Sequence, residues 1–200
     1  MKHIFILTGA GISAESGLGT FRDAAGLWTR YSLEDVATPE GYARNPKLVL
    51  DFYNARRANL RDAAPNAAHT ALARLQAGWR ASGRRLTLVT QNVDDLHEQA
   101  GAADVVHMHG ELRKIRCERC AVVTRWDDDV RLDTPCPACT HPGQLRPHVV
   151  WFGEMPFDMP LIYDALDDAD LFVSIGTSGS VYPAAAFVSH ARARGCRTVE

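Results

Sequence analysis

The chain has 200 residues, a length that suits one sizeable domain or one domain with a small insert. A hydrophobic fraction of 46% and a charged fraction of 23% are ordinary for a globular protein. The formal net charge of -2 does not favour general binding to nucleic acid or to anionic membranes. No apolar run approaches the length of a membrane span or of a secretory signal. We therefore expect a cytoplasmic protein with no specific nucleic-acid partner and no membrane partner.

Short apolar, β-rich runs alternate with helical patterns along the chain, which predicts an α/β fold with a doubly wound, mostly parallel sheet. The runs that predict strands are residues 3–8, 84–90, 104–110 and 168–178. Helices are predicted to begin at Asn45-Pro46 and at Pro65-Asn66, and to follow the strands within 91–101 and 183–195. Residues 195–200 resemble a strand that is just beginning, so we expect the domain to be incomplete at its C-terminus.

A glycine-rich turn follows the first predicted strand. Residues 9–14, "GAGISA", match the strand–GxGxx(G/A)–helix pattern, in which glycines let the backbone approach a pyrophosphate at a helix N-terminus. The pattern alone also fits a tight turn without a ligand. The second strand ending in Asp or Glu that dehydrogenases carry is missing from residues 27–41. A dinucleotide is therefore predicted, but hydride transfer is not implied.

Four cysteines form two CxxC pairs separated by fifteen residues: Cys117, Cys120, Cys136 and Cys139. This spacing predicts a four-thiolate zinc site, because each pair can occupy its own short turn and two turns complete a tetrahedron. Disulfides and a thioredoxin-like redox pair are the alternatives, and a cytoplasmic location disfavours the first. Four protein ligands leave no open position, so the zinc is predicted to be structural. Cys196 is expected to serve packing.

Motifs along the chain resemble those of the sirtuins, the NAD-dependent protein lysine deacylases. They occur in the family's order, namely "GAGISAESGLGTFRD", "TQNVDDLH", "HMHGE", the two CxxC pairs, "RPHVVWFGE" and "SIGTS". The resemblance runs from residue 5 to the end of the chain. It implies a Rossmann-like domain and a small domain made of two inserts, with NAD and substrate peptide meeting in the cleft between them. The Rossmann-like parts are about 1–24, 66–111 and 147–200, the helical insert about 25–65 and the zinc insert about 112–146.

The resemblance also implies roles for individual residues. The residues that resemble the NAD-binding loop are Gly9, Ala10, Gly11, Ile12, Ser13, Glu15, Phe21, Arg22 and Trp28. Gln91, Asn92 and Asp94 resemble the residues that line the nicotinamide and its ribose. Gly176, Thr177 and Ser178 resemble a further NAD contact of the family. The family's strand that pairs with substrate peptide is resembled by five residues of this chain: Val150, Trp151, Phe152, Gly153 and Glu154.

His109 resembles the catalytic base and is expected to act with Asn92. A histidine suits this role because its pKa lies near working pH. His109 ends a predicted strand, which places it at the carboxyl edge of the sheet where ligands bind. His107, two residues earlier, would share its face and is predicted to be structural. Asn92 and Asp94 could instead cap the following helix, but Asp95 is available for that role.

The helical stretch 51–60, "DFYNARRANL", places Tyr53 and Arg56 three residues apart and so on one face. A Tyr-x-x-Arg pair at this place resembles the subgroup of desuccinylases and demalonylases. An arginine fork binds a carboxylate in bidentate fashion, and the tyrosine hydroxyl adds a second bond. Arg57 is expected to be solvated. Ala24 and Ala25 would leave room for a longer acyl chain.

The predicted function is therefore NAD-dependent removal of succinyl, malonyl and also acetyl groups from lysines of proteins or peptides. The products would be nicotinamide, O-acyl-ADP-ribose and free lysine. One alternative is a protein mono-ADP-ribosyltransferase, which cleaves NAD in the same way. Another is a non-catalytic sensor of NAD or ADP-ribose, which would need neither Asn92 nor His109. The three functions differ in whether NAD turnover requires acyl-lysine and releases nicotinamide.

Overall fold

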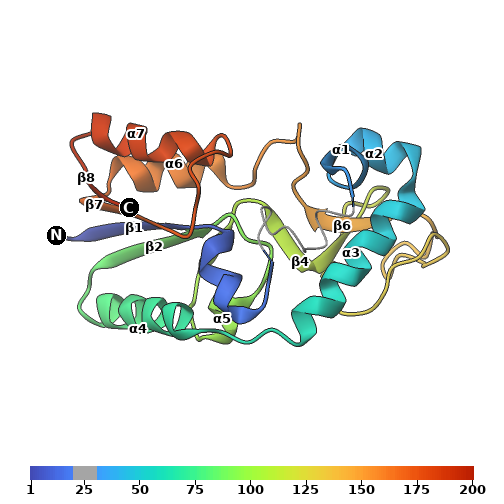
Figure 1. Cartoon of the computed structure of the whole chain (residues 1–200), viewed down its shortest axis with the longest axis horizontal. Coiled ribbons are helices and arrows are strands. Elements are labelled where there is room, and N and C mark those ends of the chain that lie inside the picture. The colour runs from blue at the N-terminus through green and yellow to red at the C-terminus, as the bar shows by residue number, and fades with distance from the viewer. Residues whose placement is uncertain (20–30) are drawn as a thin grey trace.

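The computed structural model describes residues 1–19 and 31–200, and its larger part is built on a five-stranded parallel sheet (Figure 1). The spatial order is β3-β2-β1-β7-β8, formed by β1 (His3–Thr8), β2 (Arg85–Thr90), β3 (Val105–His107), β7 (Leu171–Ile175) and β8 (Arg197–Val199). Thr8 at the end of β1 pairs with Thr90 on one side and with Ile175 on the other. The carboxyl ends of three strands therefore meet at one edge, where open α/β sheets bind ligands.

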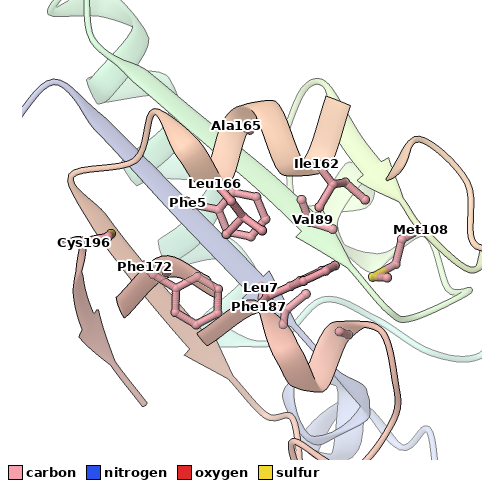
Figure 2. Packing of buried hydrophobic residues seen from close by; sticks show 12 residues of the cluster. Phe5, Leu7, Val89, Met108, Ile162, Ala165, Leu166, Phe172, Phe187 and Cys196 are labelled. Carbon is pink, nitrogen blue, oxygen red and sulfur yellow. The ribbon is translucent and has the colours of Figure 1, made fainter. Parts of the chain in front are cut away.

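Helices cover both faces of this sheet, as the doubly wound prediction requires (Figure 1). Along β1 the side chains alternate, so Phe5 and Leu7 pack toward α6 (Met159–Asp167) and α7 (Phe187–Ala193). Ile4 and Ile6 pack on the other face against α4 (Ala67–Ala81). Figure 2 shows Phe5 beside Phe172, with their ring centroids 5.7 Å apart.

A smaller lobe lies at the other end of the molecule (Figure 1). It holds α1 (Leu33–Val36), α2 (Pro39–Arg44) and α3 (Pro46–Arg61), with an antiparallel sheet of β4 (Gly110–Cys117), β5 (Val123–Arg125) and β6 (Leu145–Val149). Phe52 and Tyr53 of α3 share a buried cluster with Leu112 of β4, Val149 of β6 and Trp151. The helices and the cysteine-bearing strands are thus joined by one hydrophobic core.

Asparagines begin the two long helices, as predicted. Asn45 accepts a hydrogen bond from the Leu48 N–H, and Pro46 occupies the first turn of α3. Asn66 accepts bonds from the N–H groups of Ala68 and His69, and the His69 ring accepts the Asn66 N–H in return. This reciprocal arrangement is a capping box with histidine in the place of the usual Glu or Gln.

Several elements are shorter than expected. Residues 104–110 do not form one strand, because β3 ends at His107 and β4 begins at Gly110 in the other sheet. Gly110 has φ +81, and a Cβ there would lie 2.2 Å from the His148 carbonyl oxygen. The helix after the first strand is a 3-10 helix, η1 (Ala10–Ser16). In the described residues, the remaining short helices are α5 (Leu96–Gln99) and η3 (Ala184–Ala186). Among the described residues, no helix is long and apolar enough to cross a membrane.

Candidate functional site

Glycines join the ends of β1 and β7 at the carboxyl edge of the parallel sheet. Gly9 donates to the Ile175 carbonyl at 3.0 Å, and Gly11 donates to the Gly176 carbonyl at 2.8 Å. A Cβ at Gly9 or Gly11 would come within 2.8 Å of the Gly176 oxygen, and Gly176 itself has φ +64. The glycines are therefore required by loop-to-loop packing, in addition to leaving room for a phosphate.

A buried polar cluster lies directly behind this loop. Asn92 donates through Nδ2 to the Gly9 carbonyl at 3.2 Å and to the Ser13 hydroxyl oxygen at 3.1 Å. The Ser13 hydroxyl donates in turn to Asp94 at 3.0 Å. Burial raises the pKa of Asp94 above its usual range, while the Leu96 N–H and Ser13 oppose that shift. The structure thus brings Ser13, Asn92 and Asp94 together, and their mutual bonds determine how they point.

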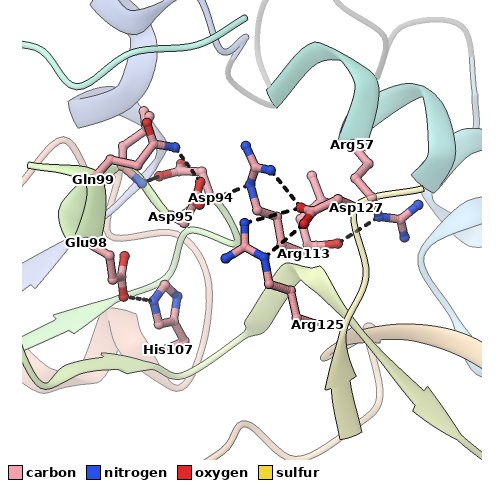
Figure 3. A network of polar contacts seen from close by, with 11 residues as sticks. Arg57, Asp94, Asp95, Glu98, Gln99, His107, Arg113, Arg125 and Asp127 are labelled. Atoms are coloured by element: carbon pink, nitrogen blue, oxygen red, sulfur yellow. Dashed lines mark hydrogen bonds and ion pairs between the residues drawn. The ribbon is translucent and has the colours of Figure 1, made fainter. Parts of the chain in front are cut away.

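The helix cap after β2 differs from the prediction. Asp94 accepts the Leu96 N–H at 3.2 Å, whereas the Asp95 side chain makes no capping bond. Asp95 instead pairs with Arg113 of β4 at 3.0 Å, as Figure 3 shows. Asp94 therefore combines a capping bond with its contact to Ser13, and Asp95 links the parallel sheet to the smaller lobe.

Two buried histidines extend the cluster and were missed from the sequence. His69 Nε2 lies 3.5 Å from the Ser13 hydroxyl, and His97 Nε2 lies 3.0 Å from the Thr8 hydroxyl. Their rings are 4.9 Å apart. Burial, with a contribution from the neighbouring His69, lowers the pKa of His97 to about 4. One signal was present: His69 shares the helix period of Leu72 and the other buried residues of α4.

His109 lies in the turn between β3 and β4, close to the cluster. Its Nδ1 lies 3.0 Å from the Gln91 carbonyl oxygen, which can only accept, so Nδ1 carries the hydrogen and Nε2 is left as an acceptor. Burial lowers the pKa of His109, and the bond to Gln91 opposes the shift without reversing it. The imidazole is therefore neutral at neutral pH. Gln91 also donates to the Thr177 hydroxyl at 3.0 Å.

Contrary to the prediction, His107 and His109 do not lie on one strand, because β3 ends at His107 and the chain turns at residues 108–109. His107 Nε2 pairs with Glu98 at 2.7 Å (Figure 3). Burial alone would lower the pKa of His107, but the hydrogen bond and charge of Glu98 outweigh burial and raise it. The expected structural role fits this pairing.

Tyr53 and Arg56 face the interior side of α3. Tyr53 is 2% exposed, and its hydroxyl oxygen accepts the Trp151 indole N–H at 2.9 Å. The Arg56 guanidinium carbon lies 5.5 Å from the Tyr53 ring centroid. Burial lowers the pKa of Arg56, and electrostatic contributions from Tyr53 and Asp94, with a hydrogen bond to Tyr53, oppose this. Arg56 is therefore within electrostatic reach of the polar cluster behind the glycine loop.

Arg57 is not solvated, which corrects the expectation from the sequence. It is 1% exposed and donates to the Leu112 carbonyl at 3.1 Å, to Asn54 at 2.9 Å and to the Asp128 carbonyl at 3.2 Å. Burial lowers its pKa to about 10. Adjacent helical residues point in different directions, so Arg57 anchors α3 to β4 while Arg56 faces the site.

Residues 150–154 do not form the expected strand. β6 ends at Val149, and the segment that follows turns. Glu154 is paired in bidentate fashion with Arg146, at 2.7 and 2.9 Å, and it accepts the Trp151 backbone N–H at 2.8 Å. Trp151 is 2% exposed, whereas Phe152 is 48% exposed. Trp151 and Glu154 therefore stabilise the turn, and Phe152 is the large side chain that it presents to solvent.

The structure describes some of the remaining residues that were predicted to bind NAD, and others lie outside its described part. Glu15 is exposed on η1, and Thr177 and Ser178 follow β7 beside Gln91. The residues that lie outside the described part of the chain are Phe21, Arg22, Ala24, Ala25 and Trp28.

The four cysteines converge in the smaller lobe. Their sulfur atoms all lie within 4.8 Å of one another, with Cys117 and Cys139 3.8 Å apart and Cys120 and Cys136 3.7 Å apart. Zinc–sulfur bonds of about 2.3 Å in a tetrahedron require sulfur–sulfur separations of about 3.8 Å. All four thiols are free of disulfides. The set is therefore positioned to bind one structural metal ion.

Comparison with known proteins is consistent with this geometry. The profile of the Sir2 family matches residues 9–183. An NAD-dependent protein deacylase of Caulobacter vibrioides is 64% identical over 202 residues, which covers 100% of this chain and 84% of the relative. The NAD-dependent protein deacylase of Escherichia coli K12 is 58% identical over 200 residues, covering 99% of this chain and 71% of the relative.

Solved structures give the same result. A crystal structure of a Sir2 homologue with NAD has a TM-score of 0.86 and 40% identity, covering 100% of this chain and 77% of that one. A Sir2 protein with a deacetylated p53 peptide and 3′-O-acetyl ADP-ribose has a TM-score of 0.79 and 29% identity, covering 98% of this chain and 79% of that one. The sequence prediction of a Rossmann-like fold with a zinc-binding insert is confirmed.

A first prediction concerns the buried His97. Its folded pKa of about 4 lies below the unfolded value of about 6.5, so its contribution to stability is complete above pH 6.5 and is lost as pH falls toward 4. The full effect corresponds to about 3 kcal/mol. Urea unfolding at a series of pH values should show that His97→Gln removes this part of the acid sensitivity. The surface change His190→Gln should leave it in place, and an unchanged pH profile in His97→Gln would contradict the prediction.

A second prediction concerns the cysteine cluster. Purified protein should carry one zinc ion per chain by elemental analysis, and Cys136→Ser should lose it because three thiolates hold the ion less tightly. The thermal midpoint should fall with the metal. Cys196→Ser, which changes a cysteine outside the cluster, should keep the zinc. A Cys136→Ser protein that retains one tightly bound zinc ion would exclude this ligand set.

Proposed function

The chain belongs to the Sir2 family and is an NAD-dependent protein deacylase, and from this premise we propose that it prefers acyl groups ending in a carboxylate, such as succinyl and malonyl. One observation carries the proposal: α3 places the Arg56 guanidinium over Tyr53 and within electrostatic reach of Asp94. Acetyl-lysine is accepted as well, because a pocket that admits a longer acid also admits a shorter chain. Protein or peptide substrates agree with the relatives' names and with the peptide complex of a relative.

NAD fits the residues at the edge of the parallel sheet. The glycines at 9, 11 and 176 let the loops after β1 and β7 approach each other closely, which side chains would block. The buried Asn92 and Asp94 provide polar groups beside these loops. We assign Gly9, Ala10, Gly11, Ile12 and Ser13, with Gly176, Thr177 and Ser178, to the phosphates. We assign Gln91, Asn92 and Asp94 to the nicotinamide and its ribose. NAD supplies the ribose carbon and hydroxyls that receive the acyl group. The products are nicotinamide, O-acyl-ADP-ribose and free lysine.

His109 is the group best suited to act as base on a ribose hydroxyl. Its Nδ1 hydrogen is directed at the Gln91 carbonyl, so the acceptor nitrogen Nε2 is available for a proton. The lowered pKa of His109 means that no proton must first be removed at neutral pH. Asn92 is held by Ser13 and the Gly9 carbonyl, and this rigid placement suits a group that orients the ribose or the carboxamide.

The acyl preference follows from the charge on α3. An arginine in partly buried surroundings keeps its charge even when burial lowers its pKa. A terminal carboxylate would compensate this charge through a charge-assisted bond, which is stronger than a bond between neutral groups and is strengthened further by low local dielectric. An acetyl methyl group offers no such compensation. Carboxylate-bearing acyl groups should therefore bind more tightly.

Other features of the proposal concern the domains and partners. We propose that residues 25–65 and 112–146 are the two inserts of the smaller lobe, in line with their shared core. The exposed Phe152 suits a contact to substrate peptide, because it follows Val150, whose N–H donates to the His109 carbonyl at 2.9 Å. The relatives' names favour deacylation over ADP-ribosyl transfer or sensing. Cytoplasmic location and the lack of nucleic-acid or membrane partners stay predictions from the sequence.

The acyl preference can be tested with NAD and matched succinyl-lysine and acetyl-lysine peptides. Arg56→Met should lower kcat/KM for the succinyl peptide by about ten- to a hundredfold, because a charge-assisted pair contributes roughly 1.5–3 kcal/mol. The acetyl value should stay within about threefold, since that substrate has no charge to lose. Arg61→Met, the same change at an exposed position of α3, is the control and should affect neither peptide. Equal losses for both peptides in Arg56→Met would exclude the clamp.

The role of His109 can be tested through pH and substitution. Because burial lowers its pKa, kcat/KM should stay level at neutral pH and fall only as pH drops below about 6.5. His109→Asn should lower turnover by about a hundred- to ten-thousandfold while NAD binding, measured by calorimetry, persists. His141→Asn, a change in the zinc insert, should leave turnover unchanged. Near-normal turnover in His109→Asn would assign the base to another residue.

A further inference from the structure

We propose that Trp151 determines carboxylate specificity without touching substrate, because its indole N–H obliges the Tyr53 hydroxyl to donate toward the acyl group. Trp151 is thus a positioning residue that acts through Tyr53. The inference rests on the proposed carboxylate clamp and adds the reason why Tyr53 contributes a donor to it.

The direction of one hydrogen bond determines where the Tyr53 hydroxyl hydrogen points. Trp151 Nε1 lies 2.9 Å from the Tyr53 hydroxyl oxygen, and both side chains are 2% exposed. An indole N–H is a donor only, so the tyrosine oxygen must be the acceptor. The single hydroxyl hydrogen of Tyr53 therefore points away from Trp151. Burial raises the pKa of Tyr53, so this hydrogen is retained at neutral pH.

The donating hydroxyl needs an acceptor, and the neighbouring groups in the described part of the chain do not supply one. The Arg56 guanidinium lies over the Tyr53 ring and carries only hydrogen-bond donors. Among the described residues, no acceptor is hydrogen-bonded to the Tyr53 hydroxyl hydrogen. A carboxylate accepts from both Tyr53 and Arg56, whereas the methyl group of acetyl-lysine accepts from neither. If the hydroxyl turned round, its lone pairs would face the carboxylate and repel it.

The surroundings of Trp151 prevent its indole from rotating away. The guanidinium of Arg146 lies over the indole, 3.4 Å from the ring centroid, and the ring of Tyr42 lies 5.2 Å away on centroids. Arg146 is bound in bidentate fashion by Glu154, which also accepts the Trp151 backbone N–H. The turn after β6 thus holds the indole N–H against Tyr53 through both its side chain and its backbone.

The test is Trp151→Phe, which keeps an aromatic ring and removes the N–H. We expect kcat/KM for the succinyl peptide to fall about three- to tenfold, the size of one neutral hydrogen bond, mainly through a higher KM. The acetyl peptide should change by less than about twofold. Trp79→Phe is the matched control, since the buried indole N–H of Trp79 has no partner among the described residues. It should leave both peptides unaffected.

A double-mutant cycle shows whether Trp151 acts through the hydroxyl. In a Tyr53→Phe background the hydroxyl is absent, so adding Trp151→Phe should cause no further loss of succinyl turnover. If the folded state of Trp151→Phe is damaged by its smaller ring, benzothienylalanine at position 151 provides the same test. That residue keeps both rings and replaces the N–H with sulfur.

Four outcomes would overturn the inference. Equal losses for the two peptides in the position-151 variants would mean that Trp151 serves packing alone. A succinyl loss that persists in the Tyr53→Phe background would mean that Trp151 does not act through the hydroxyl. If Tyr53→Phe and Arg56→Met both leave the succinyl-to-acetyl ratio unchanged, the clamp itself fails. If those two lower the ratio and the position-151 variants do not, the clamp stands and only the role of Trp151 fails.

Discussion

The site depends on a sharp turn at His109–Gly110, where the chain leaves the parallel sheet and enters the smaller lobe. Gly110 is required there because its φ is positive and the His148 carbonyl occupies the space of a side chain. The turn keeps His109 beside the carboxyl ends of the parallel strands. The return segment closes against it, because the Val150 N–H donates to the His109 carbonyl. One backbone crossing thus brings His109, the glycine loop after β1 and the smaller lobe next to each other.

Burial has different consequences for the charged groups around this crossing. It raises the pKa of Asp94 and lowers that of His109, which in both cases favours the neutral form. Burial also lowers the pKa of Arg56, but an arginine begins so far above neutrality that it stays charged. The site therefore combines the neutral imidazole of His109 with the persistent positive charge of Arg56. A substrate that carries its own carboxylate compensates that charge, and this is the physical basis of the proposed preference.

Rigid support comes from contacts between α3, β4 and the segment after β2. Arg57 binds α3 to the backbone of β4, and the Leu112 N–H donates to the Val93 carbonyl at 2.7 Å, next to Asn92. Arg113 adds an ion pair to Asp95 across the same junction (Figure 3). Helix α3 and the polar cluster are consequently connected by a short path of backbone and charged contacts.

The sequence by itself determined the features of the fold that depend on local patterns of residues. Alternating apolar runs predicted the parallel sheet, and Asn45 and Asn66 marked two helix starts. Cysteine spacing predicted the metal cluster. Each of these features depends on neighbours within a few residues or on one repeated spacing. The ordered motifs were sufficient to identify the family. Spacing on one helix also brought Tyr53 and Arg56 to the same face.

Only the tertiary structure decided which polar groups are buried and what they bind. Adjacent residues Arg56 and Arg57 look alike in the sequence, yet Arg57 is buried against the Leu112 carbonyl, 55 positions away. His69 meets Ser13 for the same reason, through a helix packed behind the loop. Residues 150–154 turn instead of extending because Glu154 pairs with Arg146. Such contacts join distant parts of the chain, and their desolvation and hydrogen-bond geometry exist only once the chain has folded.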